Sequence, residues 1–463
     1  MNETTDVRYP FDNFLEFISG NYGLRLEGIH LTIAFLFIFI GALTVYRYSN
    51  RQYLKTISIL YFCLQPFNNP SFTLLGLSLA DMCGSFIAAA CLFQFYTRGI
   101  RFNALLSGIS LFFLIAFFHG ALIWALYPEF SESSSLIARY IVVIKIAVFL
   151  MNFCWIYSTQ RMEDFFLPLV KSLGLFTVFI CVVYLIQITV FFTGTIPYGS
   201  FSGAGFSSMV SFGGVSIERG HLSKFMSPLL VSVLLCSFLY RYKFRSVLYY
   251  IIMLINFSAS GLSFMVIQFF AASFVFTNYL RRMLFSYRGA LAIFVIGALS
   301  WQFFDAYGAI VNKIFDIAIK GDESQGGGRS IGVFLKYISN YPLGIGYSAS
   351  TFRTAPDLPE INMGIYAFIT QLSFISILFM IALISLTFRA FFLFKNGSVV
   401  SRMLLIGAVS MPLIYSADIL WFVPLWWIPL FFLLSYPKEF RTITDEEWKV
   451  LAQEHPKRMA VRR

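Results

Sequence analysis

Charged residues are scarce in this chain. Asp, Glu, Lys and Arg make up 12% of its 463 residues, while apolar residues make up 58% and the mean hydropathy is +0.74. Soluble domains carry about a quarter of charged residues, so the shortage excludes an ordinary soluble domain. Such a composition is typical of a chain in a bilayer, where about 20 apolar residues per helix cross a ~30 Å hydrocarbon core.

Groups that bind metals are also few. The chain has four histidines, none at ligand spacing, and six cysteines that lie in apolar stretches without a CxxC pair. Cysteines in such a context are most often small core residues. The sequence therefore predicts no metal site and no cofactor. It also contains no GxxxxGK[ST] phosphate loop.

The net charge of +11 could suggest nucleic acid, but the placement of the basic residues argues against this. They fall in short clusters between apolar runs, where the loops on the cytoplasmic side of a membrane protein are rich in Lys and Arg. If all of these clusters are cytoplasmic, one face carries 23 of the 34 basic residues. The clusters are Arg47/Arg51/Lys55, Arg98/Arg101, Arg161/Lys171, Arg241/Lys243/Arg245, Arg281/Arg282/Arg288, Arg389/Lys395/Arg402 and the basic tail 436–463.

The apolar runs predict an all-α, polytopic integral membrane protein that forms one domain over residues 1–463, with about 11–13 transmembrane helices. Two sizeable extracytoplasmic loops follow from the orientation, 193–222 and 305–363. Full-length spans are predicted at Gly28–Tyr46, Phe72–Phe95, Leu105–Tyr127, Tyr140–Tyr157, Ser172–Phe192, Ser223–Tyr240, Ser263–Tyr279, Gly289–Phe304, Gly364–Thr387 and Met403–Leu420, with weaker ones at Ile57–Phe67, Val247–Phe257 and Trp421–Ser435.

One weak span indicates irregular backbone at membrane depth. Val247–Phe257 is too short to cross a bilayer, and the small residues Ser258–Ser263 follow it before a full helix returns. This pattern predicts a broken or re-entrant hairpin, which a membrane protein tolerates where the backbone is buried or lines a wet cavity. An ordinary tight outer turn is the alternative.

The long loop contains a candidate anion site. Arg329 follows three glycines and precedes Ile331–Ile338, whose apolar spacing predicts a short helix. Backbone N–H groups at a helix start favour anions, and a guanidinium adds bidentate phosphate geometry. The turn Tyr341–Gly346 (YPLGIG) then supplies a proline with a fixed φ and two glycines that permit close approach of the backbone to a ligand. A glycine hinge, a surface arginine and a proline turn are the plainer interpretation.

The first loop ends in a second cluster of ionisable groups at the outer membrane boundary. Glu218, Arg219, His221 and Lys224 lie within seven residues. The two cations could meet an anionic headgroup, and Glu218 or His221 could transfer a proton; an interfacial anchor is the alternative. Asp81, Lys145 and Asp418 are further ionisable groups inside or at the ends of apolar runs, where such groups are costly.

Together these features resemble the O-antigen polymerase and ligase superfamily of bacterial inner-membrane proteins. The most specific part is Arg329 followed by Asn340-Tyr341-Pro342-Leu343-Gly344-Ile345-Gly346, which is similar to the family's Arg…N-P-(L/F)-G-x-G pattern. Ser258–Ser263 and Arg219-Gly220 are similar to its hairpin break and first-loop arginine. The ligase branch has a His-Asn pair where this chain has Ile361-Asn362, and a Glu and a Gly where it has Gln371 and Ser373. These departures favour the polymerase branch.

The resemblance implies a metal-independent glycosyltransferase in the bacterial inner membrane. Its substrate would be an undecaprenyl-pyrophosphate-linked oligosaccharide, with membrane lipid around it, a chain-length regulator as a possible partner and no nucleic acid. Arg329 first and Arg219 second would stabilise the pyrophosphate, and Glu218, His221 or Asp305 would act as the base. Substrate binding would fall to Lys224, Tyr341, Gly344, Gly346, Tyr347 and Arg353. A lipid-linked oligosaccharide flippase or transporter, and an O-antigen ligase, are the alternatives.

Overall fold

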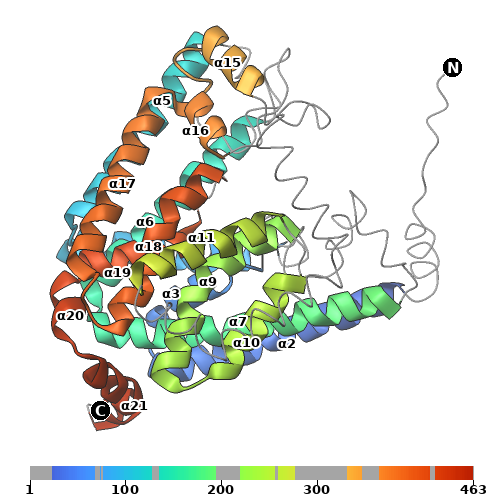
Figure 1. The fold of residues 1–463 in the computed structure, drawn as a ribbon, viewed down its shortest axis with the longest axis vertical. Helices are drawn as coiled ribbons and strands as arrows, with labels where there is room; N and C mark the ends of the chain where they lie inside the picture. The colour runs from blue at the N-terminus through green and yellow to red at the C-terminus, as the bar shows by residue number, and fades with distance from the viewer. Residues whose placement is uncertain are drawn as a thin grey trace.

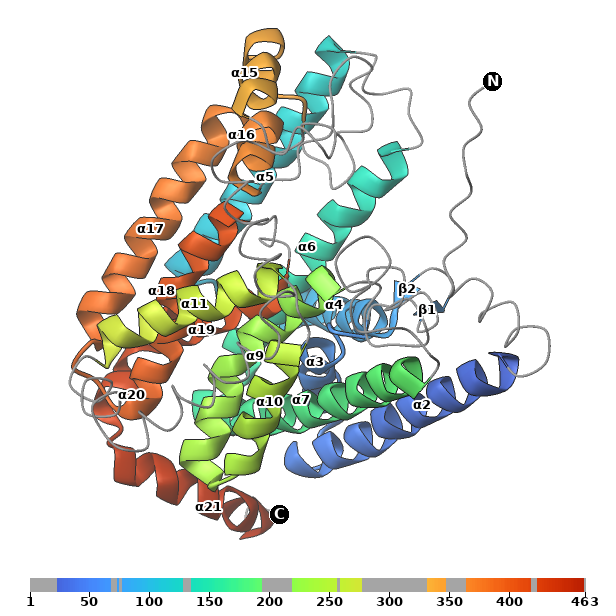
Figure 2. The same cartoon turned by 45° about the vertical axis from the view of Figure 1, so that its right-hand side comes forward.

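The fold is almost entirely helical (Figures 1 and 2). The computed structural model describes residues 23–67, 73–74, 77–127, 135–193, 219–255, 259–276, 331–346, 364–417 and 423–461. Its first helices are α2 (Gly23–Tyr48), α3 (Tyr53–Cys63), α4 (Leu79–Arg98), α5 (Ala104–Leu126), α6 (Ser135–Thr159), α7 (Met162–Thr193), α9 (Arg219–Tyr240), α10 (Lys243–Ile255) and α11 (Ala259–Val275). The later ones are α15 (Ile331–Asn340), α16 (Gly364–Leu372), α17 (Phe374–Phe394), α18 (Val399–Ala417), α19 (Pro424–Ser435), α20 (Pro437–Thr442) and α21 (Asp445–Val461).

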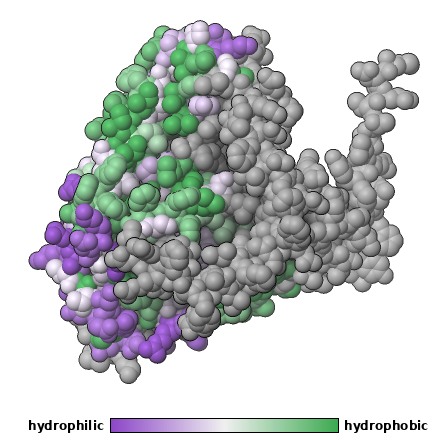
Figure 3. Space-filling model, viewed as in Figure 1, coloured by the Kyte–Doolittle hydropathy of each residue, from purple (hydrophilic) through white to green (hydrophobic). Residues whose placement is uncertain are grey.

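Five helices of the described residues are long and apolar enough to cross a membrane. They contain Leu79–Arg98, Ala104–Ile123, Met162–Leu185, Ser223–Tyr240 and Phe374–Phe394. The α17 helix presents large apolar side chains outward, with Leu378 60% and Phe388 58% exposed, as lipid-facing residues are. Figure 3 shows apolar residues over the middle of the molecule, with polar residues gathered over α15 at one end and over α20 and α21 at the other. The chain is thus a membrane-embedded all-α protein; the count of about 11–13 spans stays a prediction.

The core lies where α7, α9, α18 and α19 meet. The α2 and α7 helices run side by side, and α9 packs on α7 and α18 (Figure 1). The buried Trp426 and Trp427 of α19 fill the centre. The helices α5 and α17 lie together on the other side of α19, where the ring centroids of Phe112 and Phe379 are 4.2 Å apart. Since lipid is as apolar as these side chains, close van der Waals packing rather than the hydrophobic effect holds such helices together.

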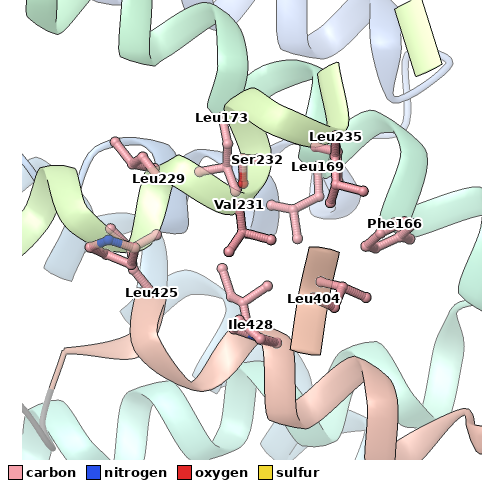
Figure 4. Close-up of a pocket in the computed structure, with 13 residues that line it drawn as sticks. Phe166, Leu169, Leu173, Leu229, Val231, Ser232, Leu235, Leu404, Leu425 and Ile428 are labelled. Atoms are coloured by element: carbon pink, nitrogen blue, oxygen red, sulfur yellow. The ribbon is translucent and has the colours of Figure 1, made fainter. Parts of the chain in front are cut away.

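A small cavity of about 10 Å³ lies in this core (Figure 4). It is lined almost wholly by apolar side chains, with Ser232 the one hydroxyl among them, and by Pro228 of α9 and Pro429 of α19. Prolines inside helices leave a carbonyl without its N–H partner and disturb regular packing. The cavity has room for about one water molecule, so we interpret it as a packing gap.

The C-terminal tail is folded onto the bundle. Trp448 of α21 is fully buried against Phe166 of α7 and Phe440 of α20, with ring centroids 5.5 and 5.4 Å away. Asp445 accepts a hydrogen bond of 2.7 Å from the backbone N–H of Val399, at the start of α18. Hydrogen bonds from the backbone and hydroxyl of Thr444 lower the pKa of Glu447, as in a capping box. The part of the predicted basic tail from α20 to the first turns of α21 therefore packs on the helix ends.

Three sequence-based boundaries are wrong. The span predicted from Phe72 begins only at Leu79, because Thr73–Leu74 and Leu77–Ser78 pair as the short antiparallel strands β1 and β2, and Ser78 then caps α4. In the predicted break at Ser258–Ser263, the residues from Ala259 onward are helical and belong to α11, which packs on α18 and α9. Residues 256–258 between α10 and α11 lie outside the described residues, so the broken hairpin stays a prediction.

The third wrong boundary concerns the span predicted at Gly364–Thr387. It is two helices, α16 and α17, separated at Ser373, whose φ of 49° and ψ of −130° no helix accommodates. Propensity does not predict this break, because the residues on both sides are apolar and suit a continuous helix.

Candidate functional site

The Tyr341–Gly346 turn is the part of the predicted outer site that the structure describes best. The N–H of Gly344 donates to the carbonyl of Tyr341 at 2.9 Å, which closes a β-turn with Pro342 and Leu343 at its centre. Proline is favoured at the second position of such a turn and glycine at the fourth. The turn directly follows α15, so the local sequence dictates where the helix ends.

This turn docks on the break between α16 and α17. The last carbonyls of a helix have no partner within it, and here the N–H groups of Ile345 and Gly346 donate to the carbonyls of Thr370 and Gln371, at 2.9 and 3.1 Å. The hydroxyl of Ser373 donates back to the carbonyl of Pro342 at 2.7 Å. The loop and the broken helix therefore satisfy each other's backbone groups.

Gly344 is required by this docking. Its φ is +87°, and a Cβ built on it would lie 2.5 Å from the carbonyl oxygen of Gln371 and 3.1 Å from that of Thr370. No side chain fits there without moving the backbone. The sequence predicted close approach of this glycine to a ligand; in the structure Gly344 lies against the end of α16 of the same chain. The proposed contact of Gly344 and Gly346 with a substrate stays a prediction.

His119 is the site residue that the sequence did not reveal. Its Nε2 lies 2.8 Å from the carbonyl oxygen of Leu343, so Nε2 carries the proton and donates it. In the neutral ring Nδ1 is then an acceptor, and this atom is buried without a hydrogen-bond partner among the described residues. A lone histidine in the apolar helix α5 carried no signal, because its partner is more than two hundred residues away in the chain.

Removing this donor is expected to loosen the turn. His119→Leu leaves the Leu343 carbonyl without its partner, which costs about 1–3 kcal/mol, whereas His119→Gln can still donate an amide N–H. We therefore expect a lower thermal midpoint in detergent for His119→Leu than for His119→Gln, measured by intrinsic fluorescence. Equal midpoints for the two variants, both at the wild-type value, would show that the hydrogen bond contributes nothing.

Aromatic rings anchor the same unit. Tyr337 of α15 and Ile345 of the turn are buried together with Ala367 of α16. The rings of Phe334 and Tyr366 stack at 4.4 Å, and Tyr341 meets Tyr127, which follows α5, edge to face at 5.5 Å. The predicted helix at Ile331–Ile338 is confirmed as α15, which ends at Asn340.

The structure describes some of the predicted site residues and not others. Tyr341, Gly344 and Gly346 lie in the docked turn, and Lys224 is half-buried in α9. Arg219 begins α9 and His221 lies in its first turn. Outside the described residues are Glu218, Asp305, Arg329, Tyr347 and Arg353. The two predicted arginines are thus not placed relative to each other.

Two of the intramembrane charges form a pair. Lys145 of α6 lies 3.1 Å from Asp81 of α4. Asp81 also accepts from the backbone N–H and the hydroxyl of Ser78, closing a capping box at the start of α4. The ion pair with Lys145 and the hydrogen bonds at the start of α4 offset the free-energy cost of an ionised Asp81 among apolar residues. The third charge, Asp418, lies outside the described residues.

An apolar groove of about 280 Å³ runs between α5 and α6. Its walls include Phe113 and Phe117 of α5 and Ile146 and Leu150 of α6, and Ser110 is the one polar residue that lines it. The groove opens to the surface, and one of its walls is α5, the helix that also contains His119. The apolar lining of the groove is suited to apolar ligands.

No family model, curated protein or solved structure matches this chain.

Proposed function

We propose that the protein polymerises a bacterial surface polysaccharide, an O-antigen or an exopolysaccharide, in the inner membrane. It would transfer a growing glycan from undecaprenyl pyrophosphate to a hydroxyl of the next lipid-linked repeat unit, on the outer side. The observation that supports the proposal is the docked Tyr341–Gly346 turn, which is the described end of the Arg329…NYPLGIG pattern. The turn that ends this pattern is held on a helix break, and the helix that follows Arg329 is anchored by the same unit.

In the proposed reaction the protein has two roles, which are to position the two substrates and to stabilise the negative charge on the leaving group. The leaving group is a lipid pyrophosphate, which is already reactive. Holding the two substrates in attack geometry lowers the entropic part of the barrier, and preorganised cationic donors stabilise the charge that develops on the pyrophosphate. Arg329 and Arg219 are the proposed donors, with Glu218, His221 or Asp305 as the proposed base. The α5–α6 groove supports the proposal because a prenyl chain needs an apolar surface.

Deletion of the gene in its host tests the function directly. We expect the surface polysaccharide, separated on a gel, to lose its ladder and to retain single repeat units, because their assembly and export would continue without polymerisation. Loss of all surface units would instead indicate a flippase. A ligase loss would leave polymer unattached to its lipid acceptor. A normal ladder in the deletion strain would overturn the proposal.

A further inference from the structure

Lys171 and Arg245 form a cluster of cations at the opposite end of the bundle from the Tyr341–Gly346 turn. It forms where the end of α2, the first half of α7 and the junction of α9 with α10 meet, close to the docked tail helix α21 (Figure 2). The positive-inside pattern predicts this end to be cytoplasmic. None of its residues belongs to the proposed polymerisation site.

Cations and tyrosine rings alternate through this cluster. Lys171 Nζ lies over the ring of Tyr48, 4.2 Å from its centroid, and 5.2 Å from that of Tyr240. The Tyr240 ring stacks on that of Tyr242 at 5.8 Å, and the guanidinium of Arg245 lies 4.3 Å from the centroid of Tyr242. Each cation thus rests on a π face, which contributes about 0.5–2 kcal/mol and does not neutralise its charge.

The backbone holds the two cations together. Arg245 Nη1 donates to the carbonyl of Lys171 at 3.3 Å and contacts Cys236 Sγ at 3.8 Å. This fixes one side of the guanidinium on the protein and leaves the other edge of the fork for a further partner. Lys171 and Arg245 are each half-buried, so they remain accessible to a ligand.

Among the described residues, no carboxylate balances these charges. In the described part of the chain, neither Lys171 nor Arg245 forms an ion pair with Asp or Glu. The link from α9 to α10 and the first residue of α10 add the exposed Arg241 and Lys243 and no acid. Along α7 the nearest carboxylate before Lys171 is Asp164, two turns away. Partly buried cations held side by side without a counter-charge indicate an external anion.

We propose that Lys171 and Arg245, with the surrounding tyrosines, bind a phosphate group, in particular that of an anionic phospholipid such as phosphatidylglycerol. A phosphate matches the free edge of the guanidinium in bidentate geometry and accepts from the ammonium. Basic sites between helices at the cytoplasmic boundary are suited to anionic headgroups. The tyrosine rings and their hydroxyls would contact the glycerol part. This inference does not depend on the proposed polymerase function.

Native mass spectrometry of the full-length protein in detergent tests the site. With equal amounts of phosphatidylglycerol and phosphatidylethanolamine, we expect the wild type to retain phosphatidylglycerol selectively and Lys171→Gln to retain about fivefold less, the factor expected for one cation near a phosphate. Arg245→Gln should lose at least as much. A parallel titration with inorganic phosphate separates a lipid source from a free one: phosphate binding that depends on the same residues, without lipid selectivity, supports an anion site for a soluble phosphate.

Matched variants make the test specific. Lys395 also lies near an aromatic ring, that of Phe392 at 5.3 Å, and among the described residues no second cation lies over that ring. Lys395→Gln should therefore leave lipid retention unchanged, and Lys171→Arg should preserve it. Lys171→Met keeps the packing of the aliphatic stem, so a loss in this variant at an unchanged thermal midpoint reports charge rather than folding. Retention of both phosphatidylglycerol and phosphate at wild-type levels in Lys171→Met and Arg245→Gln would overturn the proposal.

Discussion

Gly344→Ala is expected to abolish polymer formation while the protein still inserts into the membrane. The new Cβ would lie 2.5 Å from the Gln371 carbonyl oxygen, so the turn must lift away from α16. Lifting it breaks the hydrogen bonds that Ile345 and Gly346 donate to the end of α16. The segment that carries Arg329 and α15 then loses its anchor.

The energy of this change has two parts. An alanine at a φ of +87° is strained by about 1–2 kcal/mol, and forcing a methyl group against backbone costs a further ~1–3 kcal/mol. Both act locally, because the main core lies around α7, α9, α18 and α19. The ladder of surface polysaccharide and the amount of protein in the membrane are the two measurements.

Gly99 provides a matched control. It has a similar φ of +76°, but nothing lies within 4 Å of a Cβ placed there. Gly99→Ala therefore carries the conformational strain without the contact, and we expect it to retain the ladder. If Gly344→Ala also gives a full ladder at normal protein level, the docked turn is not needed for polymerisation.

Arg329→Lys is expected to reduce polymer strongly. Lysine keeps the positive charge but loses the planar fork that holds a phosphate through two parallel hydrogen bonds. The loss of one charge-assisted hydrogen bond in the transition state is about 1.5–3 kcal/mol, which corresponds to a roughly 10- to 100-fold slower transfer. Short chains or single repeat units should then dominate the gel.

The exposed Lys336 of α15 serves as the control for charge alone. It lies seven residues from Arg329 in the same loop, so Lys336→Gln lowers the positive charge of the loop by as much as Arg329→Gln would. We expect Lys336→Gln to leave the chain-length distribution unchanged. A normal distribution in Arg329→Lys, at normal protein level, would remove Arg329 from the proposed mechanism.

The distribution of apolar residues along the chain predicted the bounds of helices that continue without a break from end to end. The predicted runs at Leu105–Tyr127 and Ser223–Tyr240 agree with α5 and α9 to within a few residues. The short helix after Arg329 was also predictable, because its apolar spacing is local. In each case the pattern and the structure depend on neighbours within one or two turns.

The break at Ser373 shows where local patterns fail. The helices on both sides are rich in apolar residues, and residues 365–394 contain no Gly or Pro that would interrupt a continuous helix. Breaking the helix exposes the carbonyls of Thr370 and Gln371, which is tolerable only because the N–H groups of Ile345 and Gly346 lie opposite them. Ser373 adopts a φ of 49° and a ψ of −130°, a backbone conformation that glycine reaches more readily than serine.

Sequence alone determined that this chain lies in a membrane, how its charge is distributed along it and which segments are helical, since these follow from composition and short-range periodicity. Only the tertiary structure decided which groups meet. It joined His119 to Leu343, docked the YPLGIG turn on α16, and placed Lys171 beside Arg245. These pairs are separated by about twenty-five to more than two hundred residues, and their contacts depend on how helices pack, which no local pattern encodes.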